Sequence, residues 1–313
     1  MSKEKKQNII YHYCNLKAFH SIIKTKSFWL FSLSSSNDPE ELTEAGKIID
    51  KVLSEEKYKS IEKFDHSGHY EFYSLSCTSE RDSALHFNKY ADNDKGVCFG
   101  IDTDVFKKYL MHISQTDSYF DFFFFPKVIY NDKQKEKKIR KYLDDRLRFI
   151  EHPENSNIKG LSEKVINFFH SEQGKDGLRK LISITVLSCF EPKLKIINYR
   201  NEFETRMLFG RIQFQLCKHF FEGKSDENDF YNIRLKRAKS LNMDSSPEFR
   251  VMSGVRRECI ELKMETIWDK QPIKEVILGP NCKTDIEEFD GFLESNGVLC
   301  KAKPSEIKNR KWT

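Results

Sequence analysis

The sequence from residue 9 to residue 42 reads IIYHYCNLKAFHSIIKTKSFWLFSLSSSNDPEEL, and the rest of the chain is organised around it. Ile9 to Tyr13 are rich in strand formers, although a histidine, His12, lies in their middle. Asn15 has the side chain of a helix cap, and apolar residues follow it at helical spacing, namely Leu16, Phe19, Ile22 and Ile23. Phe28-Trp29-Leu30 predicts a second strand before a polar turn. We therefore expect a strand, a helix and a strand at the start of the chain.

Length and composition indicate a globular protein. The chain has 313 residues, 38% of them hydrophobic, and its 26 phenylalanines predict a core rich in aromatic side chains. We expect one domain over residues 1–313. No apolar run is long enough to cross a bilayer, and no apolar segment of the signal-peptide type follows the charged N-terminus. We therefore expect a cytoplasmic protein that does not engage a membrane.

Several kinds of site are not indicated. The eight cysteines are scattered without a CxxC pair, which argues against a zinc ribbon or a disulfide framework. His66 and His69 lie in an expected turn with no cysteine nearby, so we expect no metal site. The sequence also lacks GxGxxG, P-loop and GxSxG motifs, so it does not indicate a Rossmann fold, a nucleotide triphosphatase or a serine hydrolase.

The remaining elements predict a mixed α+β domain. Strand patterns occur at 70–77, 97–101, 122–130, 258–264 and 275–278, with a short last strand near 298–301. Helical patterns occur at 79–90, with Asp82 as a candidate cap, and at 285–296. Residues 131–190 are charged and helical, which predicts a helical insertion in a sheet-based domain.

The strongest candidate for chemistry is Glu202-Phe203-Glu204. In a strand, side chains alternate with a period of two, so both carboxylates should lie on the same side, and Arg206 extends that face. Such a set can form a salt-bridged solvent edge. It can also form a catalytic pair, because cleavage of a glycosidic bond develops positive charge that a carboxylate stabilises.

The motifs resemble those of a bacterial family of unknown function, the domain-of-unknown-function 2971 family. The similar segments are Tyr-His-Tyr at 11–13, Asn-Asp-Pro-x-Glu-Leu at 37–42, 96–102, Glu-x-Glu-x-Arg at 202–206, and 273–280. The strand-borne histidine, the aromatic-flanked middle strand and the late Glu-x-Glu also resemble the ADP-ribosyltransferase superfamily, especially its DNA- and RNA-modifying toxin branches. That resemblance implies an ADP-ribosyltransferase-like mixed or antiparallel sheet core with a helical insertion.

The same resemblance implies an NAD-dependent enzyme. Glu204 would hold the nicotinamide-ribose hydroxyl and stabilise charge on the anomeric carbon, and Glu202 would orient or deprotonate the acceptor. His12 would hydrogen-bond the adenosine ribose of NAD, with a hydrogen-bonded core histidine as the alternative. The further residues expected at the cofactor are Tyr13, Asn37, Ser76, Tyr90 and Arg206. Either Tyr90 or Tyr73 would stack on nicotinamide.

Cationic residues gather at 231–257 and in the tail from Lys301, although the net charge is only +5. Such segments are usually solvated surface. The alternative, functional interpretation is that they bind a phosphate backbone. The expected nucleic-acid contacts are Arg234, Lys236, Arg237, Lys239, Arg256 and Arg257. RNA or DNA is therefore favoured over protein as the acceptor. By analogy, the chain would be a toxin or anti-phage effector, with an antitoxin protein as a candidate partner.

Two other functions stay open at this level. A noncatalytic module would bind nucleic acid through its basic face or a degenerate pocket, with strongly salt-dependent affinity and no NAD turnover. A nuclease would need an acidic metal-binding cluster, for which Asp38, Glu40 and Glu41 qualify by composition alone.

Overall fold

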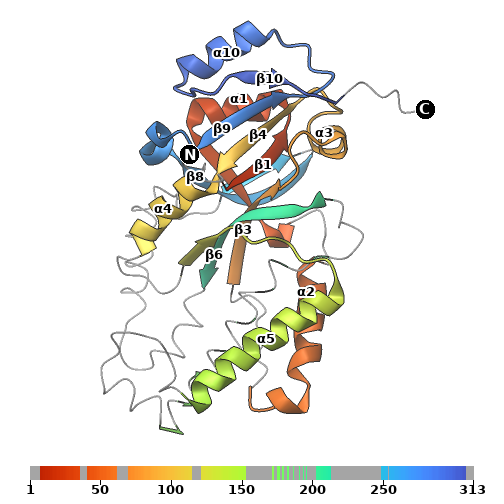
Figure 1. Cartoon of the computed structure of the whole chain (residues 1–313), viewed down its shortest axis with the longest axis vertical. Helices are drawn as coiled ribbons and strands as arrows, with labels where there is room; N and C mark the ends of the chain where they lie inside the picture. The colour runs from red at the N-terminus through yellow and green to blue at the C-terminus, as the bar shows by residue number, and fades with distance from the viewer. Residues whose placement is uncertain are drawn as a thin grey trace, which may run out of the picture.

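A mixed, open sheet forms the centre of the structure, which is a computed structural model of the whole chain (Figure 1). The structure describes residues 8–35, 41–61, 70–114, 121–152, 202–212, 248–252 and 254–307, with single positions between 171 and 195. Four groups of residues named above lie outside this part of the chain: Asn37 with Asp38 and Glu40, the turn at 66–69, the basic residues at 234–239, and the tail from 308.

Within the described residues, the sheet has ten strands. They are β1 (Ile9–Cys14), β2 (Ser27–Ser32), β3 (Tyr70–Thr78), β4 (Val97–Asp102), β5 (Asp121–Phe124), β6 (Glu204–Ile212), β7 (Glu248–Met252), β8 (Val255–Lys263), β9 (Ile273–Leu278) and β10 (Ala302–Pro304). Their order is β10-β9-β4-β1-β3-β2-β8-β7, and β6 pairs with both β3 and β5. Among the described strands, β9 and β10 are parallel and the other pairs are antiparallel.

The sheet forks at β3. One edge of β3 pairs with β6 along its whole length. The other edge pairs with β2 at Ser74 and with β1 at Thr78. Ser76 lies between these two pairings, and its carbonyl accepts a hydrogen bond of 2.8 Å from Nδ1 of His12. The histidine side chain therefore satisfies a backbone acceptor at the point where the two neighbouring strands diverge.

The two faces of the sheet are covered by different helices. The main core contains residues from α1 (Leu16–Thr25), α4 (Thr103–Ser114) and α10 (Ile286–Ser295), packed against alternate residues of the strands. The short helix α3 (Ala84–Tyr90) contacts β1 on the opposite face, where Phe87 packs with Tyr13 and Cys98. Short 3₁₀ segments occur at Leu33–Ser35, Glu56–Tyr58 and Glu265–Lys270.

The opening unit of the chain is confirmed. The Asn15 side chain accepts a hydrogen bond of 2.8 Å from the backbone N–H of Ala18, as expected for a helix cap. The helix ends at Lys26, which has a left-handed backbone, and β2 begins one residue later. Phe19 and Ile23 are fully buried, so the apolar stripe of this helix faces the core.

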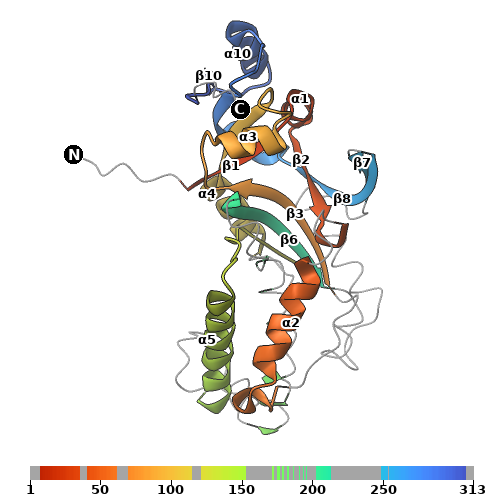
Figure 2. The ribbon, with the colours of Figure 1, turned by 90° about the vertical axis from the view of Figure 1, so that its right-hand side faces the viewer.

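A second apolar cluster lies away from the sheet. It joins α2 (Glu41–Leu53) and α5 (Asp132–Glu151) with Ile182, Val186 and Phe190. Figure 2 shows α2 and α5 side by side below the sheet. We expected helices over 131–190, but α2 also belongs to this helical part. Its apolar stripe, which would suit any surface helix, packs here against α5.

Some local expectations were wrong. Ser83, not Asp82, precedes α3, and Asp82 instead accepts hydrogen bonds from the Ser305 hydroxyl and the Glu306 N–H, at 2.6 and 2.7 Å. The last strand begins at Ala302, later than expected. The sequence patterns also missed α4 and β7, the latter because its alternation coincides with a run of charged residues.

Candidate active site

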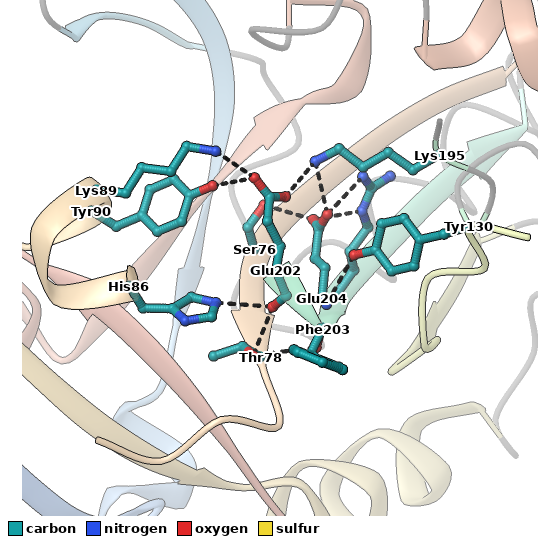
Figure 3. Close-up of polar contacts among 11 residues, drawn as sticks. Ser76, Thr78, His86, Lys89, Tyr90, Tyr130, Lys195, Glu202, Phe203 and Glu204 are labelled. Atoms are coloured by element: carbon teal, nitrogen blue, oxygen red, sulfur yellow. Dashed lines mark hydrogen bonds and ion pairs between the residues drawn. The ribbon is translucent and has the colours of Figure 1, made fainter. Parts of the chain in front are cut away.

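Glu202 and Glu204 lie together because of one left-handed residue. The strand β6 begins at Glu204, so Glu202 precedes it, and the expectation that both lie on one regular strand is wrong. Phe203 has a φ of 46°, in a region that bulky side chains rarely occupy. This turn brings the two carboxylates to the same lysine, Lys195, whose Nζ lies 2.9 Å from Glu202 and 3.1 Å from Glu204 (Figure 3).

Side chains around the turn hold its backbone. The carbonyl of Glu202 accepts hydrogen bonds from the Thr78 hydroxyl at 2.8 Å and from Nε2 of His86 at 2.9 Å. The N–H of Glu204 donates to the Tyr130 hydroxyl at 3.0 Å. These contacts come from β3, α3 and the segment after β5, so the surrounding elements stabilise the unusual backbone of Phe203.

Glu204 is the buried member of the pair. It is 4% exposed and accepts four hydrogen bonds, from the Ser76 hydroxyl, from Lys195, and twice from Arg206. These donors occupy the roughly four acceptor positions of a carboxylate. Burial alone would raise the pKa of Glu204. The positive charges of Arg206 and Lys195 have the larger effect and lower this pKa to about 2. Glu204 is therefore a fixed negative charge.

Glu202 is the more open member. Its carboxylate accepts from Lys89 at 2.7 Å, from the Tyr90 hydroxyl, and from Lys195. Burial opposes the charged form of Glu202, but these donors lower its pKa overall. Three donors leave about one acceptor position of the carboxylate for a further partner. Lys89 and Tyr90 are exposed at the surface, so they form the rim of the site.

The rim also contains an aromatic surface. The Tyr90 ring is 41% exposed and Phe203 is 53% exposed. Burial, followed by the bond to Glu202, raises the pKa of Tyr90, so its hydroxyl stays protonated and donates. Figure 3 shows Lys89 and Tyr90 of α3 reaching the Glu202 carboxylate and His86 reaching the Glu202 carbonyl, with Tyr130 and Lys195 on the other side.

His12 lies on a strand next to the carboxylate site, but its side chain points to the other face of the sheet. Tyr11 pairs with Thr78, and Thr78 pairs with Glu204, so Tyr11 and Glu204 share a face. His12, the next residue, points to the core face, where its ring contacts Phe99 with centroids 5.4 Å apart. The half-buried ring therefore does not line the carboxylate site. Burial lowers the pKa of His12, and its neutral ring donates from Nδ1 to the Ser76 carbonyl.

Two other residues expected at the cofactor, Tyr13 and Arg206, are buried and hydrogen-bond within the protein. Tyr13 is 6% exposed, and its hydroxyl donates to the Glu80 carbonyl and accepts from the Ser83 N–H. Arg206 is 1% exposed and lies against Glu204. Neither side chain reaches the surface of the site. Ser76 and Tyr90 do lie beside the carboxylates.

Two of the expected nucleic-acid residues can be placed. Arg256, on β8, is exposed, and its guanidinium lies 4.1 Å from the centroid of the Phe249 ring. Arg257 is half-buried on the same strand, opposite Arg250. The Arg250 guanidinium stacks on Trp29 of β2, with 3.2 Å between its central carbon and the ring centroid. Cations and aromatic rings are thus interleaved on this hairpin.

Within the described part of the chain, no group of three or more histidine, cysteine or acidic side chains is arranged to hold a metal ion. Likewise, no helix in the residues that could be searched is long and apolar enough to span a membrane.

The fold and the site define a mixed α+β protein with a buried carboxylate–lysine centre on one sheet face. A family model described as "Protein of unknown function (DUF2971)" matches residues 87–207, which supports the resemblance to that family. The matched range includes Lys89, Tyr90, Lys195, Glu202 and Glu204. No match was found among curated proteins or among solved structures.

Sequence reasoning named Arg206 but missed the two lysines of the site and Tyr130. Lys195 stands between Leu194 and Ile196, so a lysine in an apolar run was the available signal. Lys89 and Tyr130 carry no local signal, because only the tertiary fold brings α3 and the segment after β5 to β6.

Proposed function

We propose that this protein is an NAD-dependent ADP-ribosyltransferase whose reacting carboxylate is Glu202. The observation that carries the proposal is the pairing of two glutamates through one lysine, beside a half-exposed tyrosine on an open rim. Such a pair supplies a preorganised negative charge where a glycosidic bond would ionise.

The residues of the rim suit the chemical parts of NAD. Lys89, which is exposed, places a cation at the rim, where an anionic pyrophosphate can bind. Tyr90 and Phe203 offer aromatic surface for the nicotinamide ring. The Ser76 hydroxyl can reach a ribose hydroxyl. NAD supplies the ADP-ribose group that is transferred.

The chemistry assigned to the chain is electrostatic and acid–base. The bond between the anomeric carbon and nicotinamide breaks, and nicotinamide leaves with the bonding electrons. Glu202 stabilises the positive charge that develops on the anomeric carbon. The acceptor then forms the new bond to that carbon and loses its proton to solvent or to a carboxylate of the site. Glu204, with all its acceptor positions filled, is a positioning residue that holds Lys195 and Ser76.

The acceptor that the surface suits best is RNA or DNA. Phe31 of β2 pairs with Ser74, so Trp29 and Phe31 share the sheet face of Ser76. Arg250 stacks on Trp29 on that face. Aromatic rings and arginines together bind unpaired bases and phosphates, so this surface offers a place for a strand beside the site.

One experiment tests the proposal directly. Purified protein is incubated with NAD labelled in its adenylate and with single-stranded RNA, single-stranded DNA or protein. We expect label in a nucleic acid, removable by nuclease, and release of free nicotinamide. Absence of nicotinamide release with every acceptor would overturn the proposal.

A second candidate is a noncatalytic nucleic-acid-binding module. The observation that favours it is the saturation of Glu204, together with the three donors on Glu202, because an ion-pair network of this kind can also be structural. This candidate predicts salt-dependent binding of nucleic acid without NAD turnover.

A further inference from the structure

A cleft, here called the basic cleft, lies between α5 and the segment that follows β5. Its volume is about 460 Å³, and the lining residues important here are Lys127, Lys138, Lys141, Lys193, Tyr142 and Phe190. Ligand clefts for small molecules commonly have volumes of about 300–1,000 Å³. The basic cleft is thus large enough for one nucleotide.

The basic cleft is separate from the carboxylate site. Lys127 pairs with Thr205, which points away from the face of Glu204. The backbone of Ile129 exchanges hydrogen bonds with that of Lys193 and Lys195, at 2.7 and 3.2 Å. None of the described residues that line the basic cleft belongs to the carboxylate site.

The charge of the basic cleft is strongly positive. Among the described residues, four lysines line it against one acid, Asp145, which is itself 3.6 Å from Arg148. Lys138, Lys141 and Asp145 recur at helical spacing on one face of α5. In the part of the chain that the structure describes, Lys127, Lys138 and Lys141 have no carboxylate partner. Concentrated like charges raise the local potential and attract an anion.

Aromatic rings line the same cleft. The rings of Tyr142 and Phe190 meet edge to face, with centroids 5.6 Å apart. Nζ of Lys193 lies 5.5 Å from the Phe190 ring centroid. An aromatic wall beside lysines combines a stacking surface for a base with cations for phosphate.

We propose that the basic cleft binds a nucleotide unit, with its phosphate among the lysines and its base against Tyr142 or Phe190. The unit is either a free nucleotide or one residue of a single strand, because both present the same chemistry. This binding requires no NAD turnover, so its test is independent of the test of the transferase proposal.

The test compares two double variants of α5 in the full chain. Lys138→Gln with Lys141→Gln removes two lysines of the basic cleft. Lys133→Gln with Lys137→Gln removes two exposed lysines of the same helix that do not line it. The probes are AMP, followed by calorimetry, and a short fluorescent single-stranded RNA, followed by anisotropy over a range of salt concentrations.

We expect the variant of the basic cleft to weaken binding about tenfold or more, and to reduce the salt slope for RNA by about 0.7 for one lost phosphate contact. The control pair should bind nearly as the wild type does. Loss of AMP and RNA binding together indicates a free-nucleotide site, and loss of RNA binding alone indicates a strand. Equal weakening by both double variants, or no binding of either probe to the wild type, overturns the proposal.

Discussion

At the scale of single residues, the site depends on the backbone of Phe203. Its left-handed conformation turns two glutamates toward one lysine, and the neighbours Thr78, His86 and Tyr130 hold that turn. The sequence predicted that the two carboxylates would be close, but for a different reason, since regular strand alternation does not extend to Glu202. A left-handed phenylalanine has no local sequence signal, because local preference disfavours it.

The conformation of Phe203 can be tested by substitution. Glycine adopts a left-handed backbone without steric cost, whereas alanine does not. We expect Phe203→Gly to be more stable than Phe203→Ala by about 1 kcal/mol, although glycine usually destabilises relative to alanine. Urea unfolding of the two variants measures the difference. An alanine variant as stable as the glycine variant would contradict the left-handed assignment.

The burial of Glu204 predicts an acid-sensitive stability. Its pKa is about 2 in the folded chain, against an ordinary value of 4.5, so protonation favours the unfolded chain. The stabilisation is complete above pH 4.5 and is lost as the pH falls toward 2. The shift corresponds to about 3 kcal/mol.

We therefore expect Glu204→Gln to be less stable than the wild type at neutral pH, with the gap shrinking as the pH falls. Urea unfolding at several pH values measures this gap. A gap that stays constant down to acid pH would show that another group carries the acid dependence. Since this substitution also leaves Arg206 and Lys195 buried without their carboxylate, it tests folding as much as catalysis.

At the scale of elements, β3 organises the site. It pairs with β6 on one edge and with β1 and β2 on the other, and the side chain of His12 reaches Ser76 at the fork. The strand and helix patterns of β1, α1, β2 and β4 were predictable, because their signals are local. The order of the strands was not, since β6 reaches β3 across 128 residues, the separation of Ser76 and Glu204.

A substitution of His12 tests whether this residue stabilises the fold or contacts the cofactor. His12→Phe keeps the ring but removes the donor, so the Ser76 carbonyl loses its partner at a cost of about 1–3 kcal/mol. We expect a loss of stability in urea and unchanged affinity of the folded protein for NAD. His20→Phe is the matched control, because Nε2 of His20 is buried without a hydrogen-bond partner among the described residues. Weakened NAD binding at unchanged stability would restore the cofactor role that we first expected.

At the scale of the whole molecule, a sheet-based part carries the carboxylate site and a helical part carries most of the basic cleft. The α+β class was predictable from composition and periodicity, and so was the helix α5 at the start of the expected insertion. The participation of α2 in the helical part was not, because α2 precedes α5 by about eighty residues and packs against it only in the fold. Composition likewise indicated basic surfaces without showing that lysines of α5 would line a cleft.

The central claim is that Glu202 is the reacting carboxylate of a transferase. Its most direct test is the rate of nicotinamide release from NAD by the wild type, Glu202→Gln and Glu275→Gln. Glu275 is a suitable control, because it is also a partly buried glutamate in ion pairs, with Arg81 at 2.8 Å, and lies outside the site. We predict a fall of about a hundredfold or more for Glu202→Gln, with Glu275→Gln close to the wild type. Undiminished release by folded Glu202→Gln, or an equal fall in both variants, would contradict the claim.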